Sequence, residues 1–171
     1  MSLAVGDLAP DFTLPDTDGG EQSPGGAPAT LVVFTCNHCP YALGWHDRLL
    51  QLARDYDDVT FLAINPNDAQ RYPADSHEAM MERVEQDGGW PMPYLRDESQ
   101  EVARAYDAKT TPDVFILDAD LRLRYRGAPD ADYRDDTLNA NWLREALDAV
   151  TSGAEPQRPE TDPVGCSIKW R

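Results

Sequence analysis

The chain has 171 residues and a formal net charge of -16, with 31 acidic residues against 15 basic ones. A negative field of this size repels phosphate backbones and anionic lipids, so we expect neither nucleic acid nor a membrane surface as a partner. The length suits a core that needs no disulfides to stabilise it, and we expect residues 1–171 to form a single domain.

The basic residues are 13 arginines and only two lysines, Lys109 and Lys169. Such a surface is typical of proteins that work at molar salt, where the Debye length falls to about 3 Å, although a GC-rich genome produces the same bias. The first twelve residues show no basic and apolar leader pattern, and no apolar run approaches the roughly 18 residues of a membrane span. We therefore expect a soluble, cytoplasmic protein.

The expected elements alternate between strands and helices. A short strand at 12–14 and the turn signals around it indicate an added N-terminal β-hairpin. Apolar runs at 30–34 and 59–64 are typical of strands covered on both faces, and a helix at about 41–56 separates them. A right-handed crossover makes these two strands parallel neighbours.

The second half of the chain continues this alternation. In chain order we expect a helix at 76–86 capped by Asp75 or Ser76, an extended piece at 92–95, a helix capped by Ser99, a hairpin of 114–117 and 121–125, and a helix at about 137–150. Residues 152–171 are expected to form an irregular tail packed on the domain. This order predicts an α/β fold in three layers, with a mixed central sheet and helices on both faces.

The stretch FTCNHCPYA at 34–42 carries two of the three cysteines, Cys36 and Cys39. Proline fits at the first position of a helix because the N–H that it lacks would be unpaired there. Pro40 therefore predicts that Cys39 is the helix N-cap. With Cys36 as the N-cap, Pro40 would fall at the fourth helical position, where its ring and missing donor disrupt the first turn.

A thiol at a helix N-terminus faces the positive end of the helix dipole and free N–H groups, which favour the thiolate. We therefore predict that Cys39 is a nucleophile with a lowered pKa and a sulfur that reaches solvent, and that a protonated His38 adds to the effect. Cys36 can resolve a mixed disulfide on Cys39. Cys166 is the rival resolving thiol or, alternatively, a small buried residue that anchors the tail.

The Cys-x-x-Cys after a buried strand, the Thr111-Pro112 step before a second strand and the opening VGDLAPDFTLPDTDG resemble the thioredoxin superfamily. Over residues 3–150 they resemble, more narrowly, the peroxiredoxin-like redoxins related to alkyl hydroperoxide reductase and thiol-specific antioxidant proteins. The resemblance implies a thioredoxin-like three-layer sandwich in which Thr111 and a cis Pro112 lie beside Cys39. It also implies disulfides of proteins or small molecules, or peroxides, as substrates and a thioredoxin-type reductant. We expect no cofactor.

Two departures from the family patterns bear on the reaction. When the thioredoxin motif is laid on FTCNHCPYA without gaps, its first cysteine falls on Cys39 and its second on Ala42. The peroxiredoxin pattern Pro-x-x-x-Thr-x-x-Cys fits neither cysteine, and for Cys39 its threonine position is occupied by Cys36. Because that threonine orients the peroxide in the family, we favour thiol-disulfide exchange by Cys39 and Cys36 over a peroxidase with an antioxidant role.

Three alternatives stay open. A zinc site would draw on Cys36, Cys39, His38 and His46, although the chain has no second Cys-x-x-Cys or His-x-x-x-His to complete the usual pattern. A copper carrier would want a Cys-x-x-x-Cys pair and a distant histidine, for which His77 is the candidate. A non-catalytic binding module is the third interpretation, since a fold alone does not confer activity.

Overall fold

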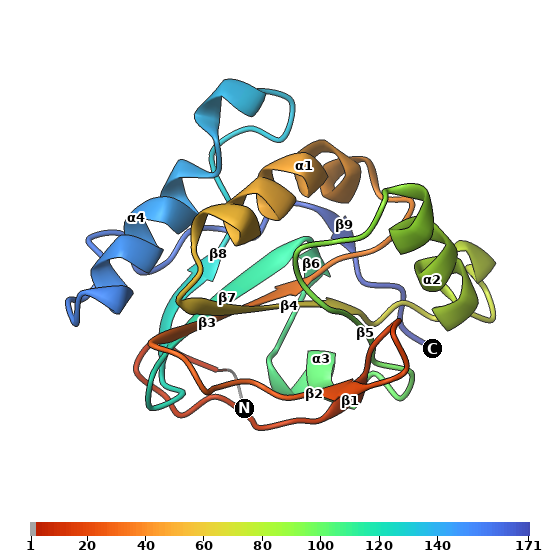
Figure 1. Cartoon of the computed structure of the whole chain (residues 1–171), viewed down its shortest axis with the longest axis horizontal. Helices are drawn as coiled ribbons and strands as arrows, with labels where there is room; N and C mark the ends of the chain where they lie inside the picture. The colour runs from red at the N-terminus through yellow and green to blue at the C-terminus, as the bar shows by residue number, and fades with distance from the viewer. Residues whose placement is uncertain (1–2) are drawn as a thin grey trace.

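The computed structural model describes residues 3–171. Its centre is a five-stranded sheet in the order β5-β4-β3-β7-β8 (Figure 1). The strands are β3 (Ala29–Phe34), β4 (Val59–Asn65), β5 (Tyr94–Arg96), β7 (Asp113–Asp118) and β8 (Leu123–Gly127). β4 runs parallel to β3 and β5, whereas β7 runs antiparallel to β3 and β8. The predicted parallel pair, hairpin and mixed sheet are therefore confirmed.

Helices cover both faces of this sheet, as predicted. α1 (Pro40–Asp55) and α4 (Asn141–Thr151) lie across one face, α3 (Glu101–Ala105) lies against the other, and α2 (His77–Gln86) packs beside β5 (Figure 1). The side chains of β3 show why both faces need a cover. Leu31 and Val33 belong to the core under α1 and α4, whereas Val32 belongs to the core on the side of α3.

The ends of several elements differ from the predicted ones by a few residues. The N-terminal hairpin forms from β1 (Leu14–Pro15) and β2 (Glu21–Gln22). α2 follows a 3-10 turn at Pro73–Asp75, and of its two predicted caps it is Ser76 that accepts a hydrogen bond from the first turn. The last predicted helix divides into a 3-10 turn at Asp136–Leu138 and α4, because Asn139 and Ala140 take left-handed conformations between them.

Ser99 was the wrong cap for α3. Gln100, with a φ of 66°, is the N-cap residue, and the buried carboxylate of Asp97 accepts the N–H groups of Val102 and Ala103. The Ser99 hydroxyl accepts one N–H at 3.3 Å. A carboxylate is the stronger acceptor, because hydrogen bonds to an ionised group are about twice as strong as neutral ones. The carboxylate of Asp97, two residues before Ser99, therefore accepts the N–H groups at the start of α3.

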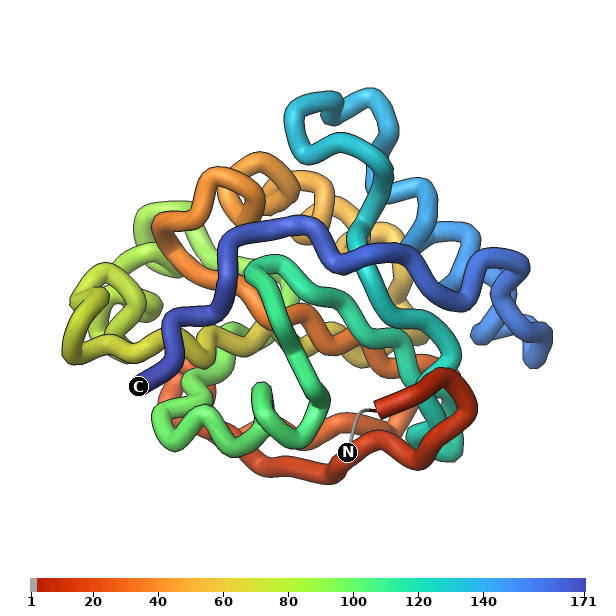
Figure 2. Tube along the Cα trace, turned by 180° about the vertical axis from the view of Figure 1, so that it is seen from behind, coloured from red at the N-terminus to blue at the C-terminus, as the bar shows by residue number. Residues whose placement is uncertain are grey.

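The C-terminal tail is irregular up to Gly165, as predicted, and then forms a strand that was not predicted. β9 (Cys166–Ser167) pairs antiparallel with β6 (Thr110–Thr111). Figure 2 shows the tail, in dark blue, crossing the molecule past the start of α1. Further along, the backbone of Lys169 binds Asn67 and Asp68, and Ile168 is buried. The end of the described chain is thus fixed on the rest of the protein.

Candidate active site

The helix that follows β3 begins where the proline predicts. Pro40 is the first residue of α1, and Cys39 is its N-cap with an extended backbone (φ -75°, ψ 130°). The Cys39 carbonyl accepts the N–H of Leu43, which closes the first helical turn. In its thiol form, Cys39 donates to the carbonyl oxygen of Thr111 over 3.2 Å.

Thr111 contacts both thiols of the Cys-x-x-Cys pair. Its hydroxyl lies 3.3 Å from the sulfur of Cys36, and its carbonyl faces Cys39. The peptide bond between Thr111 and Pro112 is cis. The cis bond and the position of Thr111 beside Cys39 are those that the family resemblance implies. Cys36, Cys39 and Ala42 form a small buried cluster at this point.

The contacts between the thiols shift their pKa values in opposite directions. The hydrogen bond from the Cys36 thiol lowers the pKa of Cys39 to about 4, and the Cys166 thiol adds to this effect, while burial opposes it. The N–H groups of Ala42 and Cys166 lower the pKa of Cys39 further. The same contact with Cys39, together with burial, raises the pKa of Cys36. These shifts favour the thiolate at Cys39 and the protonated thiol at Cys36.

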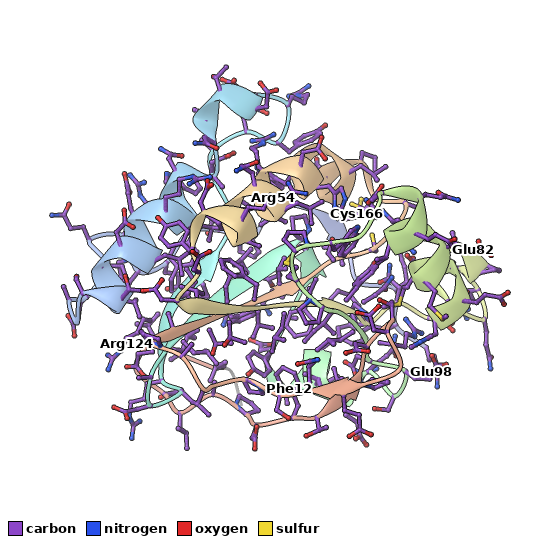
Figure 3. The ribbon with its side chains drawn as sticks, viewed as in Figure 1. Phe12, Arg54, Glu82, Glu98, Arg124 and Cys166 are labelled. Atoms are coloured by element: carbon purple, nitrogen blue, oxygen red, sulfur yellow. The ribbon has the colours of Figure 1, made fainter. Side chains whose placement is uncertain are left out.

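The tail brings the third cysteine to the same place. Cys166 packs against the cluster of Cys36 and Cys39, and Figure 3 places its side chain close to the start of α1. Gly165 permits this approach, because a Cβ at that position would clash with the carbonyl group of Thr111. Burial, followed by the contact with Cys39, raises the pKa of Cys166 to about 11. All three cysteines of the chain therefore meet at one site.

The expectation that the Cys39 sulfur reaches solvent is wrong. Cys39 and Cys36 are each only 1% exposed, whereas Cys166 is half-buried. The reason is the pairing of β9 with β6, which lays the tail against Thr111 and over the two thiols. Both sulfurs are therefore covered in this conformation of the tail.

His38 forms a contact that the sequence did not reveal. Its Nδ1 lies 2.6 Å from Oδ2 of the fully buried Asp75, and its ring stacks on that of Tyr72 with 5.6 Å between centroids. The other oxygen of Asp75 accepts the N–H of Asn37 at 2.7 Å. One carboxylate thus holds both residues between the cysteines. The sequence points to Asp75 only as a candidate cap of α2.

Side chains from three other elements fix the same loop. Arg83 of α2 donates to the carbonyl of Cys36 at 3.0 Å and to Oδ1 of Asn37 at 3.1 Å. Tyr94 of β5 donates its hydroxyl to the same Asn37 oxygen at 2.8 Å. The amides of Asn65 and Asn67 donate to Asp75. The loop is therefore held in one conformation before any substrate binds.

The zinc set considered from the sequence is not assembled in the described part of the chain. His46 instead lies 3.0 Å from Asp87 and packs on Trp90. Within residues 3–171 the metal-ligating side chains that come together are those of Cys36, His38 and Asp75, with ligand atoms within 4.8 Å of one another. Both oxygens of Asp75 already accept N–H groups, which suits a carboxylate that orients a histidine.

Comparisons with known proteins agree with this fold. The chain matches the AhpC/TSA family over residues 5–126. It is 41% identical to an uncharacterized conserved protein from Geobacillus kaustophilus, with a TM-score of 0.92 over 99% of this chain and 93% of that one. It is 36% identical to a hypothetical protein from Sinorhizobium meliloti, with a TM-score of 0.93 over 100% and 97% of the two chains. No curated protein matches the chain.

A more distant likeness extends to a peroxidoxin, BcpB from Mycobacterium tuberculosis, at 16% identity and a TM-score of 0.64 over 81% of this chain and 94% of that one. It shows the shared fold alone. The family match includes Cys36, Cys39 and Thr111, whereas Cys166 lies beyond it. No helix within residues 3–171 is long and apolar enough to cross a membrane. The chain belongs to the AhpC/TSA family and is a thioredoxin-like redoxin.

Proposed function

We propose that this redoxin is a thiol-disulfide oxidoreductase in which Cys39 attacks the substrate and Cys36 resolves the mixed disulfide. The observation that carries the proposal is the contact of Cys39 with two thiol donors at the start of α1, which keeps its pKa well below that of a free thiol. The thiolate is the attacking form of cysteine, so this pKa supports Cys39 as the nucleophile at neutral pH once the tail uncovers it. In this proposal the whole chain works as one domain.

The reaction begins when the Cys39 thiolate attacks a disulfide R–S–S–R′. A bond forms between Cys39 and one sulfur, and R′–S⁻ leaves and takes up a proton. Cys36 then loses its proton and attacks the Cys39 sulfur, so that R–S⁻ leaves and a Cys36–Cys39 disulfide remains. His38 and Asp75 lie within 4.8 Å of the Cys36 sulfur, where the imidazole can accept the proton that Cys36 gives up. A thioredoxin-type dithiol returns two electrons to the enzyme.

A peroxidase with an antioxidant role is the second candidate, and the AhpC/TSA family match favours it. The threonine of the peroxiredoxin pattern is replaced by Cys36 relative to Cys39. Thr111 supplies a hydroxyl nearby, but that hydroxyl is engaged with the sulfur of Cys36 at 3.3 Å. Disulfide exchange needs only a thiolate and a second thiol, which supports it as the first candidate.

The proposal is tested by following the first turnover on insulin disulfides and on hydrogen peroxide. We expect Cys39→Ser to abolish the release of the first insulin thiol, whereas Cys36→Ser keeps that release and slows later turnovers. The two variants form a matched pair, because each replaces one cysteine sulfur by a serine oxygen. Full insulin reduction by Cys39→Ser would refute the assignment. Peroxide consumption without any insulin reduction by the wild type would favour the peroxidase.

A further inference from the structure

The three thiols differ in how an outside molecule can reach them. Cys36 and Cys39 are each 1% exposed, but Cys166 is half-buried on the tail and open to solvent on one side. Cys166 also touches Cys39, to which it presents both its thiol and its backbone N–H. A sulfur bonded to Cys39 is therefore available at the surface only if it belongs to Cys166.

Leaving-group chemistry also favours attack of an external thiol on the sulfur of Cys166. In thiol-disulfide exchange, a nucleophile displaces fastest the thiol with the lowest pKa, and it must reach the sulfur that it attacks. In a Cys39–Cys166 disulfide the Cys36 thiol, which is the largest cause of the low pKa of Cys39, stays free, so Cys39 is a good leaving group there. An external thiol that displaces Cys39 must attack its partner, and of the two partners Cys166 is the exposed one.

We infer that Cys166 is the point at which an external dithiol reduces the oxidised enzyme, after the disulfide has passed from Cys36–Cys39 to Cys39–Cys166. This inference rests on the proposed function, because it needs an oxidised Cys39. It assigns the tail, which lies outside the family match, a direct part in the catalytic cycle. Gly165 supports the assignment, since only a residue without a side chain lets Cys166 come this close to Thr111.

The transfer within the enzyme changes no oxidation state. Cys166 loses its proton, and its sulfur attacks the Cys39 sulfur that it contacts. The Cys39–Cys166 bond forms while the bond from Cys39 to Cys36 breaks, and Cys36 leaves and takes up a proton. The contact permits this step, because Cys166 packs against the cluster that holds Cys39 and presents its thiol to that sulfur.

The external dithiol then supplies two electrons. One of its sulfurs attacks Cys166, and Cys39 leaves as the thiolate. The second sulfur of the dithiol attacks the first, so that Cys166 leaves and takes up a proton. The dithiol ends as a disulfide, and the enzyme ends with three free thiols.

The experiment maps the disulfide and times its reduction in the full chain. The wild type, Cys36→Ser and Cys166→Ser are oxidised with diamide, quenched in acid with N-ethylmaleimide, digested without reductant and analysed by mass spectrometry. We expect a Cys39–Cys166 disulfide in the wild type and in Cys36→Ser, and only Cys36–Cys39 in Cys166→Ser. Reduction by dithiothreitol should be slower by about tenfold or more in Cys166→Ser, because the exposed sulfur is lost.

Ser167→Ala is the matched control, since it changes the exposed neighbour in β9 and keeps all three thiols. It should be reduced at the wild-type rate. Cys166→Ala, checked by circular dichroism, repeats the test with a different side chain. A wild type that holds only Cys36–Cys39, with Cys166→Ser reduced at the same rate, overturns the inference and leaves the proposed function intact. A wild type in which Cys39 enters no disulfide overturns both.

Discussion

Nδ1 of His38 lies 2.6 Å from Oδ2 of Asp75, so a carboxylate from the turn before α2 holds the histidine between the two cysteines. We expect Asp75→Asn to lower the free energy of unfolding by about 2 kcal/mol, because an amide cannot accept all the N–H groups that meet this buried carboxylate. Urea denaturation measures the change. Asp58→Asn, at an exposed acid, should stay within about 0.5 kcal/mol of the wild type. Equal losses in both variants would contradict the role given to Asp75.

Cys36 is the largest cause of the low pKa of Cys39, so its removal should be visible in the titration. We expect Cys36→Ala to raise the pKa of Cys39 from about 4 towards the value of a free thiol, about 8.5. Cys166→Ala removes a weaker donor and should raise it less. Ultraviolet absorbance of the thiolate, recorded against pH, follows both changes. An unchanged midpoint in Cys36→Ala would contradict the part that the Cys36 thiol plays in this pKa.

Gly165 lies so close to Thr111 that a substitution there can test whether the tail limits access to the thiols. Gly165→Ala places a Cβ against the Thr111 carbonyl, so the tail has to move away from β6. We expect faster alkylation of Cys39 by iodoacetamide and a loss of stability of about 1–3 kcal/mol, typical of an overpacked contact. Val164→Ala, at the exposed neighbouring residue, should alter neither quantity. Unchanged alkylation in Gly165→Ala would mean that the tail does not limit access.

Asp113 follows the cis proline, and burial raises its pKa from 3.8 to about 6. The folded protein therefore binds this proton more tightly than the unfolded chain does. Stability contributed by the protonated form is fully present below pH 3.8 and is lost as the pH rises to about 6. The difference between the two pKa values limits this loss to about 3 kcal/mol. Urea denaturation at a series of pH values measures the profile. Asp113→Asn should flatten this part of it, and parallel profiles for the two proteins would contradict the assignment.

The features that local chemistry determines could be predicted from the sequence. Pro40 predicts the start of α1 because a helix tolerates proline only in its first turn. In the structure, Pro40 is the first residue of this helix. Continuous apolar runs predicted β3 and β4 because a strand covered on both faces has no polar side. These arguments need no knowledge of residues far away in the chain.

The features that depend on distant partners could not be predicted in the same way. β9 has only two residues, and nothing in its sequence names β6 as the strand that it joins. Asp75 carries no local mark that separates it from the many exposed acids of this chain, and its role follows from meeting Asn37 and His38 in the fold. The odd number of cysteines was the one signal of Cys166, and its contact with Cys39 needed the structure.

The order of the chain also sets the order in which this chemistry becomes available. Cys39 leaves the ribosome long before Cys166, and part of what lowers its pKa comes from the thiol and N–H of that later residue. During synthesis the nascent chain therefore carries a less ionised Cys39, which is a poorer nucleophile towards disulfides that it meets. Until the tail pairs with β6, Cys39 lacks both this contribution to its low pKa and the segment that covers it.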